Sequence, residues 1–146
     1  NLFISLPGFV RERDEAAPNS LLNYGYAILR AIIARALVGC GLLPTLGIHH
    51  HNKYNAYCLA DDIMEPYRPY VDLLVVEICE EEGFPTELTK EIKARLLALP
   101  TLDVEIEGQR RPLMLAATQT ATSLLRCFTG ESRRLAYPLL SCEPSD

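Results

Sequence analysis

Several features that define common protein classes are missing from this sequence. The five cysteines, at positions 40, 58, 79, 127 and 142, include no Cys-x-x-Cys pair, which argues against a disulfide framework and a structural zinc knuckle. No apolar run approaches the roughly 20 residues of a membrane span, because Arg30 and Arg35 interrupt the longest candidate, residues 27–43. Residues 1–10 lack the basic start and cleavage site of a signal peptide. We therefore expect a soluble, cytoplasmic protein with no membrane association.

The acidic residues are concentrated in the middle of the chain. The net charge of the 146 residues is −5, which alone argues against a nucleic-acid partner. Residues 61–107 hold thirteen acidic and four basic residues, whereas the segments on either side are slightly basic. The acidic segment is either a solvated helix face or a carboxylate metal site close to bound phosphates.

Helical patterns account for most of the chain. Pro18 closes an irregular lead-in, residues 1–18, and Asn19 or Ser20 can cap the helix that follows. A further helix opening near Tyr57 is either kinked or restarted at Pro66. Apolar spacing and flanking glycines or prolines predict long helices over residues 21–40, 71–82, 87–99 and 112–128.

These patterns predict the fold class. Residues 104–109 suggest only a short strand or turn, and residues 141–146 a flexible tail. We expect one all-α domain over residues 1–146, an irregular helical bundle, and bundle geometry alone does not indicate a function.

Residues 46–69 contain the side chains that can carry chemistry. Three adjacent histidines, 49–51, precede Asp61, Asp62 and Glu65, and imidazole and carboxylate are ligands for divalent metals. In a helix, Glu65 would share a face with either aspartate. The alternatives are a histidine-rich surface loop and aspartates that favour a helix N-terminus through its dipole.

An ordered series of motifs resembles one protein family over almost the whole chain. The motifs are LNYGY at 22–26, LGIHH at 46–50, LADDIMEPYRP at 59–69, PLM at 112–114 and LAYP at 135–138. This series is similar to the CRISPR-associated spacer-acquisition integrase, the catalytic first subunit of the CRISPR adaptation complex. The last two motifs resemble its type II branch.

The resemblance implies a set of site residues. His50 and Glu65 would bind Mg²⁺ or Mn²⁺, and Asp62 would assist directly or through the second shell. We expect His50 and Glu65, rather than His49 or His51, to face one pocket. His50 could instead shuttle a proton, Lys53 could contact phosphate, and Arg68 would either contact DNA or form a structural ion pair. Tyr24 and Tyr26 are expected in the core.

The resemblance also implies a reaction and partners. A protospacer 3′-hydroxyl attacks a phosphodiester at the edge of a CRISPR repeat, a metal-dependent transesterification by an endonuclease-like integrase. The partners would be protospacer and repeat DNA, a second copy in a homodimer, and the small second subunit of the adaptation complex. Other type II adaptation proteins and the effector nuclease could also take part.

One departure from the family pattern limits this interpretation. The family has a further metal-binding glutamate on an upstream helix and an N-terminal β-rich dimer domain, and neither is found in this sequence. Glu12 and Glu15 lie too late in the chain to replace that glutamate. We therefore expect the C-terminal lobe of a larger α+β protein, inactive alone. The alternatives are a non-catalytic scaffold or an unrelated metal-dependent hydrolase.

Overall fold

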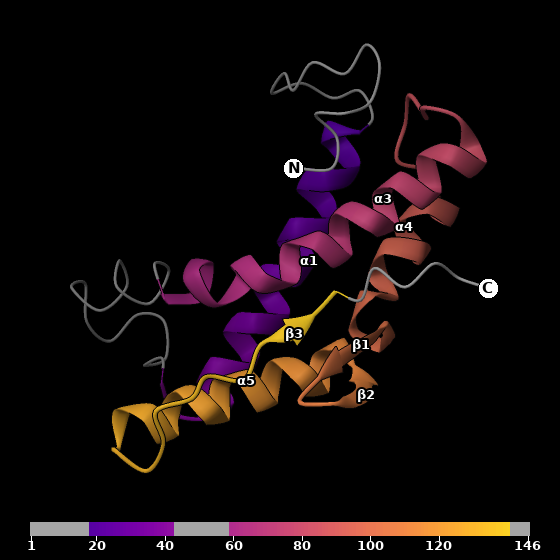
Figure 1. The fold of residues 1–146 in the computed structure, drawn as a ribbon. Coiled ribbons are helices and arrows are strands. Elements are labelled where there is room, and N and C mark those ends of the chain that lie inside the picture. The colour runs from indigo at the N-terminus through magenta and orange to yellow at the C-terminus, as the bar shows by residue number, and fades with distance from the viewer. Residues whose placement is uncertain (1–17, 43–58, 141–146) are drawn as a thin grey trace, which may run out of the picture.

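The computed structural model describes residues 18–42 and 59–140. Within these ranges the chain is mainly helical, and a small sheet lies beside α5 (Figure 1). Residues 59–64 are also helical. The elements, in order, are α1 Asn19–Gly39, η2 Glu65–Tyr67, α3 Arg68–Glu82, α4 Lys90–Leu97, η3 Leu99–Thr101, β1 Asp103–Ile106, β2 Gln109–Pro112, α5 Leu113–Phe128 and β3 Pro138–Leu139.

Helix α1 is the central element of the core. It contacts α3, α4 and α5, and α3 crosses it in Figure 1. Its fully buried side chains recur at helical spacing, namely Leu21, Leu22, Leu29, Ile33 and Leu37, each 0% exposed. The packing of this apolar face joins the other helices into one core.

By length and composition, α1 could also cross a membrane. This finding corrects the expectation that no apolar run approaches that length, since Arg30 and Arg35 do not lower the mean hydropathy enough. A core helix passes the same test, and one face of α1 packs against α3, α4 and α5.

The start of α1 differs from the prediction. Pro18 occupies the N-cap position, and no side chain caps the helix. Asn19 is buried, and the buried Ser20 Oγ has no hydrogen-bond partner. The predicted cap by Asn19 or Ser20 is therefore wrong, because the helix begins at Asn19 and both residues belong to its first turn.

The helix is interrupted and restarted near Pro66 rather than kinked, which is one of the two predicted alternatives. Residues 59–64 are helical, η2 follows as a 3₁₀ turn with Pro66 in its first turn, and α3 then starts at Arg68. Helix α3 ends at Glu82 as predicted, before Gly83 with φ 71°. It begins three residues before the predicted Val71.

The later helices follow the predicted pattern with shorter bounds. Helix α4 is shorter than predicted, and Thr89 caps it by accepting a hydrogen bond from the Ile92 backbone N–H at 3.2 Å. Helix α5 starts after Pro112 and ends at Phe128 as predicted.

The prediction of a mainly helical fold is confirmed, and the structure adds a small three-stranded sheet that the all-α prediction did not include. Its order is β2-β1-β3, and both pairings are antiparallel. Glu107 and Gly108 connect β1 to β2 with φ 49° and 75°, the positive values of a type I′ hairpin turn. The sequence predicted a strand or turn here but missed β2 and β3, because both are short and contain proline, which is rare in strands.

Helices α1 and α3 approach each other closely at Gly25. A Cβ atom built on Gly25 would lie 2.6 Å from Val71 Cγ1 and 3.6 Å from Leu96 Cδ2. Because Val71 is fully buried, its side chain has little space to move away. The glycine therefore sets the distance between these two helices.

We expect Gly25→Ala to destabilise the protein, although alanine is the better helix former by about 1 kcal/mol. Overpacking of this kind costs about 1–3 kcal/mol, to be measured by urea denaturation. The matched control is Gly39→Ala in the same helix, where the added Cβ meets no atom within 4 Å. Equal effects of the two substitutions would contradict the close contact.

Candidate metal centre

Two of the predicted site residues lie on the segment that turns into α3. Asp62 is exposed in the helical stretch 59–64, and Glu65 is the exposed first residue of η2. His49, His50, His51 and Lys53 lie outside the described residues. A common pocket for His50 and Glu65 therefore stays a prediction.

The segment around Glu65 has an outer polar side and an inner apolar side. Ala60, Ile63, Met64 and Tyr67 are 2%, 5%, 1% and 0% exposed. Asp62 and Glu65 are exposed and three residues apart along a helical backbone, a spacing that places two side chains on one face. The segment therefore exposes two carboxylates to solvent, while its apolar side chains are buried in the core.

The neighbouring Asp61 is held in a different way. One carboxylate oxygen, Oδ1, lies 2.8 Å from Arg30 Nη2 and 3.0 Å from Arg30 Nε. This ion pair ties the segment to α1. Asp61 is thus engaged with α1, and Asp62 is the better candidate to act with Glu65.

Glu65 is connected to α1 through Arg68. Its Oε1 lies 3.0 Å from Arg68 Nε, at ion-pair distance but without hydrogen-bond geometry. The Arg68 guanidinium lies over the ring of Tyr26, 5.1 Å from the centroid. The Tyr26 hydroxyl donates a hydrogen bond to Asp72, a carboxylate only 7% exposed.

These contacts bear on two sequence-based interpretations. Of the two alternatives for Arg68, the ion pair is the contact present in the structure, and a contact with DNA stays a prediction. Tyr24 and Tyr26 are only partly buried against the core, and Tyr26 makes polar contacts in addition. Tyr26 and Asp72 were not predicted at this site, because no motif spacing connects α1 to α3.

The described carboxylates fit part of a site for a hard divalent cation. Asp62 and Glu65 supply the oxygen donors that Mg²⁺ and Mn²⁺ prefer. Within residues 18–42 and 59–140, no three His, Cys, Asp or Glu side chains form a group that could hold a metal ion. A complete site therefore requires at least one ligand from elsewhere.

A buried hydrogen-bond chain holds the base of this segment. The Tyr67 and Thr120 hydroxyl oxygens are 2.6 Å apart, and Thr120 donates to the Ala136 carbonyl at 2.7 Å. Because threonine has one hydroxyl proton, Tyr67 is the donor in the first bond. Burial raises the pKa of Tyr67 to about 12, so the phenol remains a donor at neutral pH.

We expect Thr120→Val to cost more stability than Tyr67→Phe. The valine would leave the Tyr67 hydroxyl and the Ala136 carbonyl without their partner in the core, at about 1–3 kcal/mol for each unpaired group. The phenylalanine leaves only one acceptor unpaired. Chemical denaturation of both variants and the double variant measures this, and the reverse order would contradict the assigned donor.

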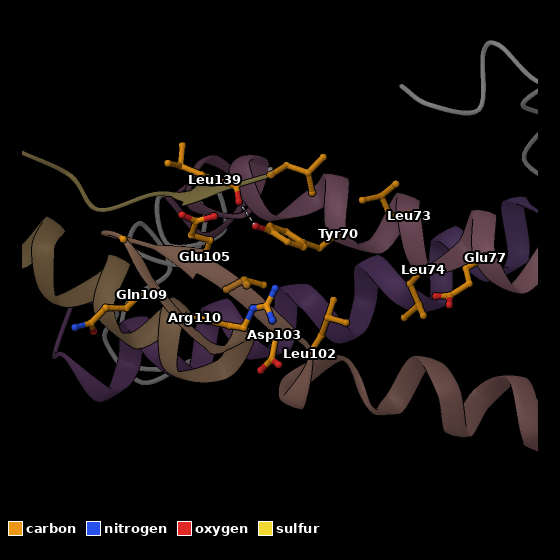
Figure 2. A pocket seen from close by; sticks show the side chains of 13 residues that line it. Tyr70, Leu73, Leu74, Glu77, Leu102, Asp103, Glu105, Gln109, Arg110 and Leu139 are labelled. Atoms are coloured by element: carbon orange, nitrogen blue, oxygen red, sulfur yellow. Dashed lines mark hydrogen bonds between the residues drawn. The ribbon is translucent and has the colours of Figure 1, made fainter. Parts of the chain in front are cut away.

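A groove separate from these residues lies between α3 and the sheet. It has a volume of about 440 Å³, and its lining includes Tyr70, Leu73, Glu105, Arg110 and Leu139. Figure 2 shows the Tyr70 hydroxyl pointing to Leu139, whose carbonyl it contacts at 2.6 Å. Of the predicted site residues that the structure describes, Asp62, Glu65 and Arg68 do not line this groove.

Comparisons with known proteins identify the family. Residues 10–97 match the family model described as CRISPR associated protein Cas1, a match that includes the candidate segment. The chain therefore belongs to the Cas1 family, as the motifs implied.

Curated relatives agree with this assignment. The chain is 40% identical over 121 residues to "CRISPR-associated endonuclease Cas1" of Neisseria meningitidis serogroup C (strain 8013), covering 83% of this chain and 40% of the relative. It is 35% identical over 120 residues to "CRISPR-associated endonuclease Cas1 2" of Pyrobaculum aerophilum, covering 81% and 40%. A "CRISPR-associated exonuclease Cas4/endonuclease Cas1 fusion" of Geobacter sulfurreducens is 40% identical over 53 residues, covering 36% and 10%. The chain spans about two fifths of the length of the first two relatives.

Proposed function

We propose that this chain is the C-terminal, type II-like catalytic lobe of an integrase that inserts spacers into a CRISPR array. The observation that carries the proposal is the exposed Asp62–Glu65 pair, on a segment whose inner side chains are buried and which lies inside the region that matches the Cas1 family. The names of the relatives support a nuclease. The family match also disfavours an unrelated metal-dependent hydrolase.

The site residues would have distinct roles. Glu65, with help from Asp62, would hold Mg²⁺ or Mn²⁺ together with His50 and a glutamate from outside this chain. The bound ion supplies charge stabilisation at the scissile phosphate. Glu65 contributes an anionic oxygen, His50 a nitrogen ligand or a proton shuttle, and Lys53 a sequence-independent contact to the DNA backbone.

The proposed partners follow from this role. They are protospacer and repeat DNA, a second copy of the integrase, the small second subunit of the adaptation complex, and other type II adaptation proteins with the effector nuclease. We place the protein in the cytoplasm, away from membranes. The packing of the apolar face of α1 against α3, α4 and α5 supports that placement.

The first experiment substitutes Glu65 and His50 in the integrase that carries this chain. Glu65→Ala and His50→Ala should each lower strand transfer by on the order of 10²-fold or more, by analogy with other lost charge-stabilising groups. DNA binding by gel shift should stay nearly unchanged, because it depends on basic side chains elsewhere. Glu80→Ala, an exposed glutamate late in α3, is the matched control, and full strand transfer by Glu65→Ala would refute the assignment.

A second experiment tests the contact of Lys53 with phosphate. Lys53→Ala should weaken binding to all DNA sequences alike and reduce the slope of log affinity against log salt by about one unit. Gel shifts over a salt series measure both effects. A loss confined to one DNA sequence would contradict a backbone contact.

A third experiment uses the 146-residue chain alone. We expect no measurable strand transfer with Mg²⁺ or Mn²⁺, because a site without one of its carboxylates should hold the ion weakly. Robust metal-dependent strand transfer by this chain would show that its own residues complete the site.

A further inference from the structure

The contacts around Arg68 connect an exposed carboxylate to a buried one. The Glu65 side chain is 62% exposed, and its partner Arg68 is 31% exposed. Arg68 in turn lies over Tyr26 of α1, and the Tyr26 hydroxyl donates to the buried Asp72 of α3. Solvent exposure therefore falls along this series of contacts, from the Glu65 side chain at the surface to the buried Asp72.

We propose that Tyr26 and Arg68 are positioning residues that fix the orientation of the Glu65 carboxylate for metal binding. This inference depends on the proposed function, in which Glu65 is a metal ligand. Tyr26 supplies a fixed surface for the guanidinium, whose Nε lies at ion-pair distance, 3.0 Å, from Oε1 of Glu65. One oxygen is thereby restrained while the other carboxylate oxygen remains available.

An ion pair alone would not achieve this. In an exposed ion pair, the entropy lost by ordering two mobile side chains offsets most of the electrostatic attraction. Surface ion pairs therefore contribute little free energy to holding a side chain in one orientation. Arg68 differs because its planar guanidinium lies over the face of an aromatic ring, a geometry that lysine cannot reproduce. The ring is itself held at its hydroxyl by Asp72, one helical turn after Arg68.

The position of Tyr26 depends on the neighbouring glycine. Gly25 allows α1 to approach Val71, which lies between Arg68 and Asp72 in α3. The helix crossing therefore places the Tyr26 ring next to both side chains. The orientation of Glu65 is set by the packing of two helices rather than by its own turn alone.

The positive charge of Arg68 acts in the opposite direction on metal binding. A cationic side chain next to a metal ligand repels the metal, so removing it would strengthen binding if charge dominated. Tyr26 substitutions separate the two effects, because they leave every charge in place. Weaker metal binding on loss of the ring can then be assigned to lost orientation.

The test uses Tyr26→Leu, Tyr26→Phe and Arg68→Lys in the integrase that carries this chain. Binding of Mn²⁺ is measured by the electron paramagnetic resonance signal of the free ion, and strand transfer is resolved into kcat and KM for DNA. Tyr26→Leu and Arg68→Lys should weaken Mn²⁺ binding and lower kcat by about 10-fold, within the range for residues that orient metal ligands. The KM for DNA should not change, and Tyr26→Phe should lose less because it keeps the ring.

Tyr70→Phe is the matched control, since it removes a tyrosine hydroxyl bond, to the Leu139 carbonyl, away from Glu65. It should leave Mn²⁺ binding and kcat unchanged. If Tyr26→Leu does not fold, Arg68→Lys still decides the question, because lysine keeps the positive charge but not the planar guanidinium that lies over the ring.

Unchanged Mn²⁺ binding in Tyr26→Leu and Arg68→Lys, with Glu65→Ala inactive, would overturn the inference and leave the proposed function intact. A rise in the KM for DNA in Arg68→Lys, with unchanged Mn²⁺ binding, would make Arg68 a phosphate contact and also overturn it. An active Glu65→Ala would instead contradict the proposed function itself.

Discussion

The close crossing of α1 and α3 at Gly25 is the constraint on which the candidate site depends. Gly25 leaves space for the buried Val71, and the adjacent Tyr26 then reaches Arg68 and Asp72. One turn further along α1, Arg30 pairs with Asp61. Side chains of one helix thus hold both ends of the segment that carries Asp62 and Glu65.

A second restraint acts on the same segment from the interior. Tyr67 is fully buried and donates to Thr120 of α5, which donates to the backbone ahead of β3. The inner side of the segment is thus anchored by the buried hydroxyl groups of Tyr67 and Thr120, which are hydrogen-bonded. Such support is what a site needs to hold ligands in a fixed geometry.

Local patterns predicted most of the helices. Pro66 marked the break before α3, Gly83 its end, and Pro112 the start of α5. The predicted N-terminal cap of α1 was wrong, because tertiary packing, which local sequence rules do not describe, buries Asn19. The sheet was missed for a similar reason, since Pro138 is an unusual strand residue whose pairing with Ile106 depends on the return of the chain after α5.

Only those residues of the candidate site that belong to a recognisable sequence motif could be predicted. Glu65 and Asp62 were found from their spacing and from the resemblance to the integrase family. The roles of Tyr26 and Asp72 could not be predicted, because these residues are 46 positions apart and meet only through the helix crossing. The ion pair of Arg68 was one of two alternatives that the sequence left open.

The central claim is that Glu65 is a metal ligand of an integrase. The most direct test is anomalous diffraction from crystals of the integrase that carries this chain, soaked in Mn²⁺. We expect a manganese peak within bonding distance of both the Glu65 carboxylate and the His50 imidazole. A well-occupied manganese site that involves neither residue would contradict it.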